Sequence, residues 1–253
     1  MVFLPFALRP LILEWKKLRK HLVYLSITSL LGITLFNTLI YLAGHTTTAL
    51  NLSLISITFP IFIVILSRIL YGEPISFNKS MGIVMVVSGI LFLLTKGDIS
   101  ILKEISFAVG DIWMMAAAIT FAVYSILLKH KPADVSIWSF QLSTFILGLV
   151  FLTPFYIWDL KHATGIDFDI NIIVSILYVG VFASLFAFVL WNNAVAKVGP
   201  AKAGMVYYTL PIFSGMLAYW FLEEHIGFWH LGSAVLIVPG ILIANVERKK
   251  ANA

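Results

Sequence analysis

Long apolar runs separated by short polar breaks make up almost the whole sequence, and this pattern leaves few folds open. A helix needs about 20 mostly apolar residues to cross the hydrocarbon core of a bilayer. With 60% hydrophobic and only 11% charged residues, the 253-residue chain holds little besides such runs, so no soluble domain is expected. The apolar content excludes a disordered chain, and the lack of cysteine excludes a disulfide-stapled secreted domain. We therefore predict an all-α polytopic membrane protein.

Eight of these runs are long enough to be complete spans, at approximately 22–43, 49–71, 81–95, 107–128, 137–158, 171–192, 203–222 and 229–246. A ninth run, Met1–Leu13, is too short to cross a bilayer. It does not resemble a signal peptide, because the basic cluster follows the apolar run and no small-residue cleavage site is present. We interpret it as the end of a span whose beginning is missing, which gives about nine spans.

The basic residues fall unevenly on the two sides of the predicted membrane. If each run crosses once, three lie on one side (Lys96, Lys103 and Lys161) and thirteen on the other (Lys16, Lys17, Arg19, Lys20, Arg68, Lys79, Lys129, Lys131, Lys197, Lys202, Arg248, Lys249 and Lys250). Positive loops remain cytoplasmic, so the C-terminus is predicted to be inside, in the plasma or inner cell membrane. The net charge of +5 is thus assigned to loops rather than to a nucleic-acid site.

The sequence also contains an internal repeat. An offset of 151 pairs the segment 59–62 with 210–213, so that Pro60 matches Pro211, and the same offset pairs Glu73 with Glu224, Gly89 with Gly240, and Ala43 with Ala194. The chain crosses the membrane five times between the two proline-containing spans, so the copies are expected to have opposite orientations. Inverted repeats are characteristic of secondary transporters. By comparison with the second copy, the first copy lacks about 40 N-terminal residues of a symmetric ten-helix plan. Two explanations of this difference stay open: a start codon placed too late in the gene, and a protein that is genuinely short.

Several motifs resemble the drug/metabolite transporter superfamily and its EamA-type repeats. The segments 32–43 and 48–51, with Pro60, Gly72–Glu73, Gly82 and Gly89, resemble the first repeat. A second set of segments resembles the second repeat: Gly110–Asp111, Phe121–Tyr124, Trp191–Ala194, Val198–Ala201, Leu210–Pro211, Leu222–Glu224 and Gly232.

The resemblance implies a ten-helix plan with both termini cytoplasmic. It assigns residues 1–98 to a first repeat without its first helix and part of its second, 107–247 to a second repeat, and 248–253 to a cytoplasmic tail. It also implies export of small organic metabolites, such as amino acids or related amphiphilic solutes, by alternating access.

Polar side chains inside the spans are the candidates for the solute pathway, since such groups tend to face a bundle interior. Asn37 and Tyr41 share one helical stripe, and Asn192 is the repeat equivalent of Tyr41. The alternative roles are hydrogen bonds between helices and, for Asn192, a helix cap. Tyr124 and Gln141 are added by analogy with the family. Acidic residues such as Asp111 lie near span ends, where they are hydrated or cap a helix.

Tyr208, Pro60 and Pro211 complete the candidate set. Tyr208 lies on a face of otherwise small residues, which close helix packing alone would also explain. Each proline falls near mid-span, removes a backbone hydrogen bond and kinks its helix, so Pro60 and Pro211 are predicted hinges or fixed bends. The partners expected are a small-molecule substrate and the lipid bilayer.

No enzyme, metal or cofactor motif is present in the sequence, and no ATP-binding motif, so a solute gradient or ion gradient is expected to drive transport. The spans lack a central charge, which predicts a neutral or zwitterionic solute. The alternative is a truncated or vestigial transporter that lacks independent activity or acts only by assembly with another chain. A homo-oligomer also stays open.

Overall fold

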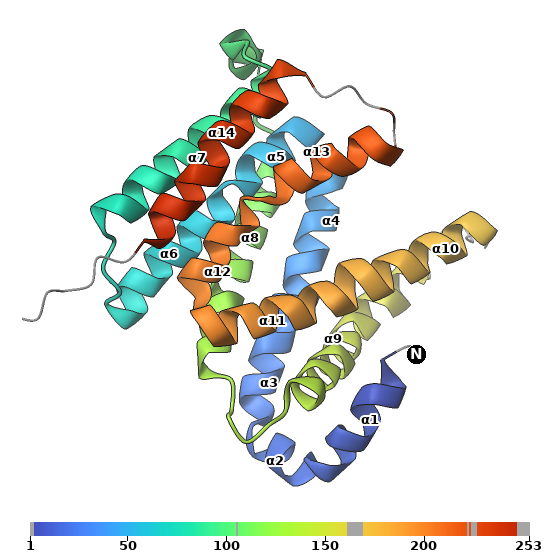
Figure 1. Ribbon diagram of the computed structural model, residues 1–253. Helices are drawn as coiled ribbons and strands as arrows, with labels where there is room; N and C mark the ends of the chain where they lie inside the picture. Colours follow the sequence, from blue (N-terminus) through green and yellow to red (C-terminus); the bar gives the residue numbers. More distant parts are fainter. Residues whose placement is uncertain (1–2, 105, 161–168, 222, 224–226, 247–253) are drawn as a thin grey trace, which may run out of the picture. The chain divides into compact units, whose positions relative to one another are not determined.

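The computed structural model describes residues 3–104, 106–160, 169–221, 223 and 227–246. The predicted tail, 248–253, and the acid Glu224 lie outside the described residues. The described part consists of helices, turns and connecting loops, with no strand in it, as predicted. Its packing divides the chain into two units, each built from two separate stretches of sequence. Figure 1 labels the helices that belong to them.

Seven helices in the described part are long and apolar enough to cross a membrane: Leu22–Thr46, Ala49–Tyr71, Phe77–Thr95, Val109–His130, Ile137–Ile157, Ile170–Val198 and Phe228–Asn245. The N-terminal run forms the shorter apolar helix α1 (Leu4–Leu13). These assignments match seven of the eight predicted spans to within six residues at each end.

The eighth predicted span, 203–222, is not one helix. It consists of α12 (Pro200–Tyr207) and α13 (Leu210–Phe221), with a break at Tyr208 and Thr209. The break lies just before Pro211, whose ring nitrogen cannot donate the hydrogen bond that would join the two helices. The repeat equivalent is also interrupted: α5 (Ala49–Ser56) and α6 (Thr58–Tyr71) meet at Ile57, three residues before Pro60.

Wider, π-helical turns interrupt two other spans. One, Leu30–Leu35, separates α3 (Leu22–Ser29) from α4 (Phe36–Thr46). The other, Val179–Phe186, separates α10 (Ile170–Tyr178) from α11 (Ala187–Val198). Shifting the first turn by the repeat offset of 151 places it inside the second. The two sequence copies therefore share local backbone irregularities as well as residues.

Unit 1 comprises Met1–Thr38 and Val123–Gly199. Its central element is α9 (Ile137–Leu160), which packs against α1, α3, α11 and the first π-helical turn. The short helix α2 (Trp15–Lys20) connects α1 to α3. Close contact between α3 and α9 is fixed by the Ser29 hydroxyl, which donates to the Thr144 carbonyl at 2.6 Å.

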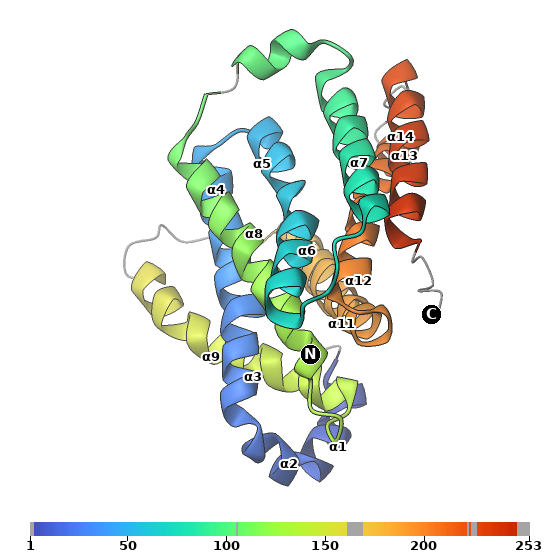
Figure 2. The same ribbon diagram turned by 90° about the vertical axis from the view of Figure 1, so that its left-hand side faces the viewer.

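Unit 2 comprises Leu39–Ala122 and Pro200–Ala253. Helix α7 (Phe77–Thr95) runs beside α14 (Phe228–Asn245), as Figures 1 and 2 both show, and α12 packs on α6. A Cβ on Gly82 would overlap the Gly240 carbonyl, so only glycine permits this approach of α7 to α14. Helix α8 (Val109–Leu127) begins in this unit, and the division between the units falls within α4 and α8.

Candidate functional site

Three of the predicted pathway residues form a hydrogen-bonded chain inside unit 1. The Tyr124 hydroxyl on α8 donates to Asn192 Oδ1 on α11 at 2.7 Å. Asn192 Nδ2 then donates to Gln141 Oε1 on α9, also at 2.7 Å. All three side chains are at most 2% exposed. The chain thus links three helices that are far apart in the sequence.

The position of the Tyr124 ring is set by its neighbours. A Cβ on Gly32, in the π-helical turn of the first span, would overlap the ring, so glycine is required there. The ring meets that of Phe188 edge-on, with centroids 6.1 Å apart. Beside the chain, Trp191 Nε1 donates to the Ser125 hydroxyl at 3.2 Å. These contacts hold the phenol at one place, from which its hydroxyl reaches Asn192.

The chain ends at Gln141 Nε2, a buried nitrogen that has no hydrogen-bond partner among the residues that the structure describes. A buried amide that lacks its partner costs about 1–3 kcal/mol, so such groups call for an explanation. Both N–H groups of Gln141 are available to an acceptor such as a carbonyl, carboxylate or hydroxyl oxygen.

Two other predicted pathway residues lie outside this chain. Asn37 is half-buried and donates to the Ile33 carbonyl of its own helix at 2.7 Å. Tyr41, in unit 2, is 64% exposed on α4. The common cavity predicted for Tyr41 and Asn192 stays a prediction.

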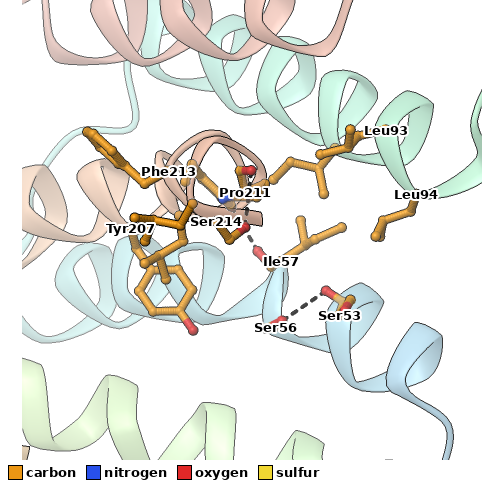
Figure 3. A pocket seen from close by; sticks show the side chains of 13 residues that line it. Ser53, Ser56, Ile57, Leu93, Leu94, Tyr207, Pro211, Phe213 and Ser214 are labelled. Carbon is orange, nitrogen blue, oxygen red and sulfur yellow. Dashed lines mark hydrogen bonds between the residues drawn. The ribbon is translucent and has the colours of Figure 1, made fainter. Parts of the chain in front are cut away.

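The remaining candidates lie in unit 2, where a cavity of about 390 Å³ forms beside both interrupted helix pairs (Figure 3). Tyr208 and Pro211 line it, with residues of α5, α7 and α13. The Tyr208 hydroxyl donates to the Ile57 carbonyl at 2.9 Å, which connects the two breaks directly. The predicted small-residue face therefore carries a phenol with a defined partner.

Pro60 is buried in the first turn of α6 and is not among the cavity residues. A Cβ on Gly204 of α12 would lie 3.6 Å from the Pro60 Cα, which places the two helices in close contact. The preceding residue, Phe59, stacks on Tyr207 with ring centroids 5.6 Å apart. Pro60 thus belongs to the packed interface between α6 and α12.

Asp111 has the role of a helix cap, one of the two roles considered for it. Its carboxylate accepts hydrogen bonds from the Ala108 backbone N–H at 2.9 Å, from Asn51 Nδ2 at 2.9 Å and from the Thr47 hydroxyl. It therefore closes the first turn of α8 and ties it to the start of α5. The motifs Gly110–Asp111 and Thr48–Asn51 were visible in the sequence, but their contact with each other was not.

Glu14, which sequence analysis did not single out, caps α9 outside the spans. Its Oε2 accepts from the Ser136 backbone N–H and hydroxyl, each at 3.0 Å. Burial acts to raise the pKa of Glu14, but hydrogen bonds from Ser139 and Ser136, with the charge of Lys17, hold that pKa below its ordinary value. Nearby, His21 Nε2 lies 3.3 Å from Asp134 Oδ1. A lone Glu before a basic cluster gives no sequence signal for such a cap.

The part of the chain that the structure describes holds no group of three or more His, Asp or Glu side chains that could bind a metal ion. The polar chain consists of hydrogen-bonded neutral side chains, and the cavity is lined by apolar side chains, hydroxyls and Pro211. Neither arrangement contains a nucleophile paired with a base.

Comparisons with known proteins identify the family of this sequence. The sequence matches the profile of the EamA-like transporter family over residues 1–95 and 108–246. It is 24% identical to an uncharacterized transporter of Archaeoglobus fulgidus, covering 94% of this chain and 84% of that protein. It is also 24% identical to the uncharacterized transporter YyaM of Bacillus subtilis, covering 90% and 75%.

A solved crystal structure that shares 20% sequence identity superposes with a TM-score of 0.71 over 88% of this chain and 75% of the other, which shows a common fold. The family match covers most of the chain, and the apolar helices agree with it. The protein is therefore a multi-pass membrane protein that belongs to the EamA-like transporter family.

Proposed function

We propose that this protein moves small neutral or zwitterionic organic solutes, such as amino acids, out of the cell by alternating access. The proposal includes a location in the cell membrane with the C-terminus in the cytoplasm, motivated by the thirteen-to-three distribution of basic residues. Membership of a transporter family supports a small-molecule substrate.

The observation that carries the proposal is the unpaired Nε2 of Gln141 at the end of the buried polar chain. A solute that offers an oxygen acceptor would satisfy this nitrogen while it is bound, and would return it to an unpaired state on release. Such a contact binds moderately, since the donor is neutral. A transported solute has to be released as well as bound, and a moderate contact meets that need.

The scarcity of buried charged side chains supports a solute without net charge. Among the buried residues of the described part, Asp111 is the only charged one, and three donors already satisfy its carboxylate. A strongly ionic solute would find no free buried counter-charge there, and an unpaired buried charge is costly. Hydrogen bonds and aromatic contacts are the means of recognition that these residues offer.

The test is transport by purified protein in liposomes, with radiolabelled L-phenylalanine and L-threonine as probes. Gln141→Leu removes the unpaired donor, together with the oxygen that accepts from Asn192, and keeps the side-chain size, so we expect the KM of a transported probe to rise about tenfold. Thr144→Val is the matched control, because this buried hydroxyl of the same helix bonds to the Gln141 carbonyl within α9. Unchanged transport by a folded Gln141→Leu variant would remove Gln141 from the proposal.

A further inference from the structure

The hydroxyl side chains that line the cavity of unit 2 give it a polar surface that offers mainly hydrogen-bond acceptors. From this surface we infer a second binding site, which takes a small, mostly apolar molecule with a hydrogen-bond-donating head, an amine or an alcohol. The inference concerns binding to unit 2 and does not rest on the proposed transport of amino acids.

The hydroxyl protons around the cavity are already used inside the protein. Ser53 donates to the Ala49 carbonyl at 2.8 Å, Ser56 to that of Leu52 at 2.9 Å, and Ser214 to that of Pro211 at 3.1 Å. Figure 3 shows Ser53, Ser56 and Ser214 around the cavity. A hydroxyl has one proton and two lone pairs, so these oxygens can still accept but no longer donate.

The two prolines add backbone acceptors. In an unbroken helix the N–H of each residue bonds to the carbonyl four positions earlier, and proline has no N–H. Pro60 therefore leaves the carbonyl of Ser56 without its helical donor, and Pro211 does the same to Tyr207. Both Ser56 and Tyr207 line the cavity. Carbonyls at interrupted membrane helices are a recurrent means of binding polar groups.

The rest of the lining sets the shape and polarity of the ligand. Its walls are apolar, with side chains such as Ile90, Leu94 and Leu217, and no lining residue carries a charge. The ring of Tyr207 can also attract an ammonium group through its π-face. A volume of about 390 Å³ falls within the range of small-molecule sites, about 300–1,000 Å³.

A ligand with an acceptor head fits this surface poorly. Among the lining side chains, only the Tyr207 hydroxyl keeps a proton that is not committed to a backbone carbonyl, since Tyr208 donates to Ile57. A carboxylate would meet several acceptors and one donor, with its charge unpaired. The site should therefore favour donor heads over acceptor heads on the same apolar body.

Three probes with one ring and similar length test this selectivity: 2-phenylethylamine, 2-phenylethanol and 3-phenylpropanoate. Equilibrium binding to the purified full chain in lipid nanodiscs should be at least about tenfold tighter for the amine and the alcohol than for the carboxylate. Equal binding of all three would indicate apolar space open to any hydrophobic molecule, lipid included, and would overturn the inference. Tighter binding of the carboxylate, or no binding of any probe, would do the same.

Substitutions of residues in and beside the cavity test whether the amine binds there. Leu217→Trp places a large ring at a lining position that is 52% exposed, so the fold should tolerate it while amine binding is lost. Met216→Trp is the control, because the neighbouring residue on α13 is 43% exposed and does not line the cavity. Ser56→Ala should weaken amine binding by about three- to tenfold by removing one acceptor. Unchanged amine binding by folded Leu217→Trp would place the site elsewhere and refute the proposal.

Discussion

A single glycine decides where the most buried phenol of unit 1 can lie. The ring of Tyr124 occupies the space that a side chain at position 32 would need, and its hydroxyl begins the polar chain to Gln141. The sequence shows Gly32 only as part of a family motif. Its physical role depends on a contact with a helix more than ninety residues later, which no local pattern reveals.

Replacing this glycine gives a direct prediction. Gly32→Ala should lower the free energy of unfolding by about 1–3 kcal/mol, because a Cβ there overlaps the Tyr124 ring. Gly44→Ala, near the end of the same span, has nothing within 4 Å of the added Cβ and should instead stabilise by about 0.5–1 kcal/mol. Thermal unfolding in detergent measures both; equal shifts of Tm would contradict the close contact.

Glu14 provides a prediction about pH. Its pKa in the folded protein lies below the ordinary value of 4.5, so the stability it contributes is fully present above that pH and is lost as the pH falls through the lowered pKa. The difference in Tm between the wild type and Glu14→Gln should therefore be largest near pH 7 and shrink on acidification below pH 4.5. A difference that stays constant from pH 7 to the acid range would show that the carboxylate charge does not stabilise α9.

Sequence analysis identified the members of the polar chain but not its bonding. Asn192 was selected as a polar group in an apolar span and as the repeat equivalent of Tyr41, whereas Tyr124 and Gln141 were selected by analogy with the family. Which of them would touch depends on the relative rotation of α8, α9 and α11, and periodicity within one helix does not contain that information. The same reasoning selected Tyr41, which is largely exposed.

At the scale of elements, prolines differ in their effect on the helices that contain them. Helix α14 continues through Pro239, whereas α12, the helix that precedes Pro211, ends at Tyr207 and is followed by a break at Tyr208 and Thr209. The sequence predicted a kink at Pro211, but residues 203–222 were assigned to one continuous span. An apolar run looks the same whether its backbone is continuous or broken, so hydropathy could not locate the break.

This difference allows a controlled test of the proposed hinge. Pro211→Ala restores a backbone donor and should join α12 to α13, which should change the transport rate in liposomes more than the KM of the probe. Pro239→Ala is the control, since that helix is already continuous. An unchanged rate with folded Pro211→Ala would argue against a hinge at this position.

At the scale of the whole molecule, the order and approximate bounds of the spans could be predicted, but their packing could not. Each structural unit combines a stretch from the N-terminal part of the sequence with one from the C-terminal part, so each takes helices from both predicted repeats. The repeat boundaries themselves stay a prediction. Charge and hydropathy describe how each helix meets lipid and water, whereas the partners of a helix depend on the shapes of their surfaces, such as the glycine contact between α7 and α14.

The orientation of the chain in the membrane can be tested by reporter fusions. Fusions near His21 and at the C-terminus should report the cytoplasm, and a fusion near Thr47 should report the opposite side, because the basic loops are expected to stay inside. Each fusion needs a matched measurement of protein level, so that a missing signal is not mistaken for a location. Identical reporter activity at His21 and Thr47 would contradict the predicted topology.

The pairing of α7 with α14 also bears on how the protein is made. Ribosomes add about 5–20 residues per second, so the 150 residues from the end of α7 to the end of α14 take roughly 8–30 s to synthesise. During that interval the glycine face of α7, including Gly82 and Gly89, is already in the membrane while its partner helix has not yet emerged. A nascent chain that stops short of α14 would expose this face to lipid and to other helices. Insertion of α14 is therefore the step that protects unit 2 from misassembly and quality-control proteolysis.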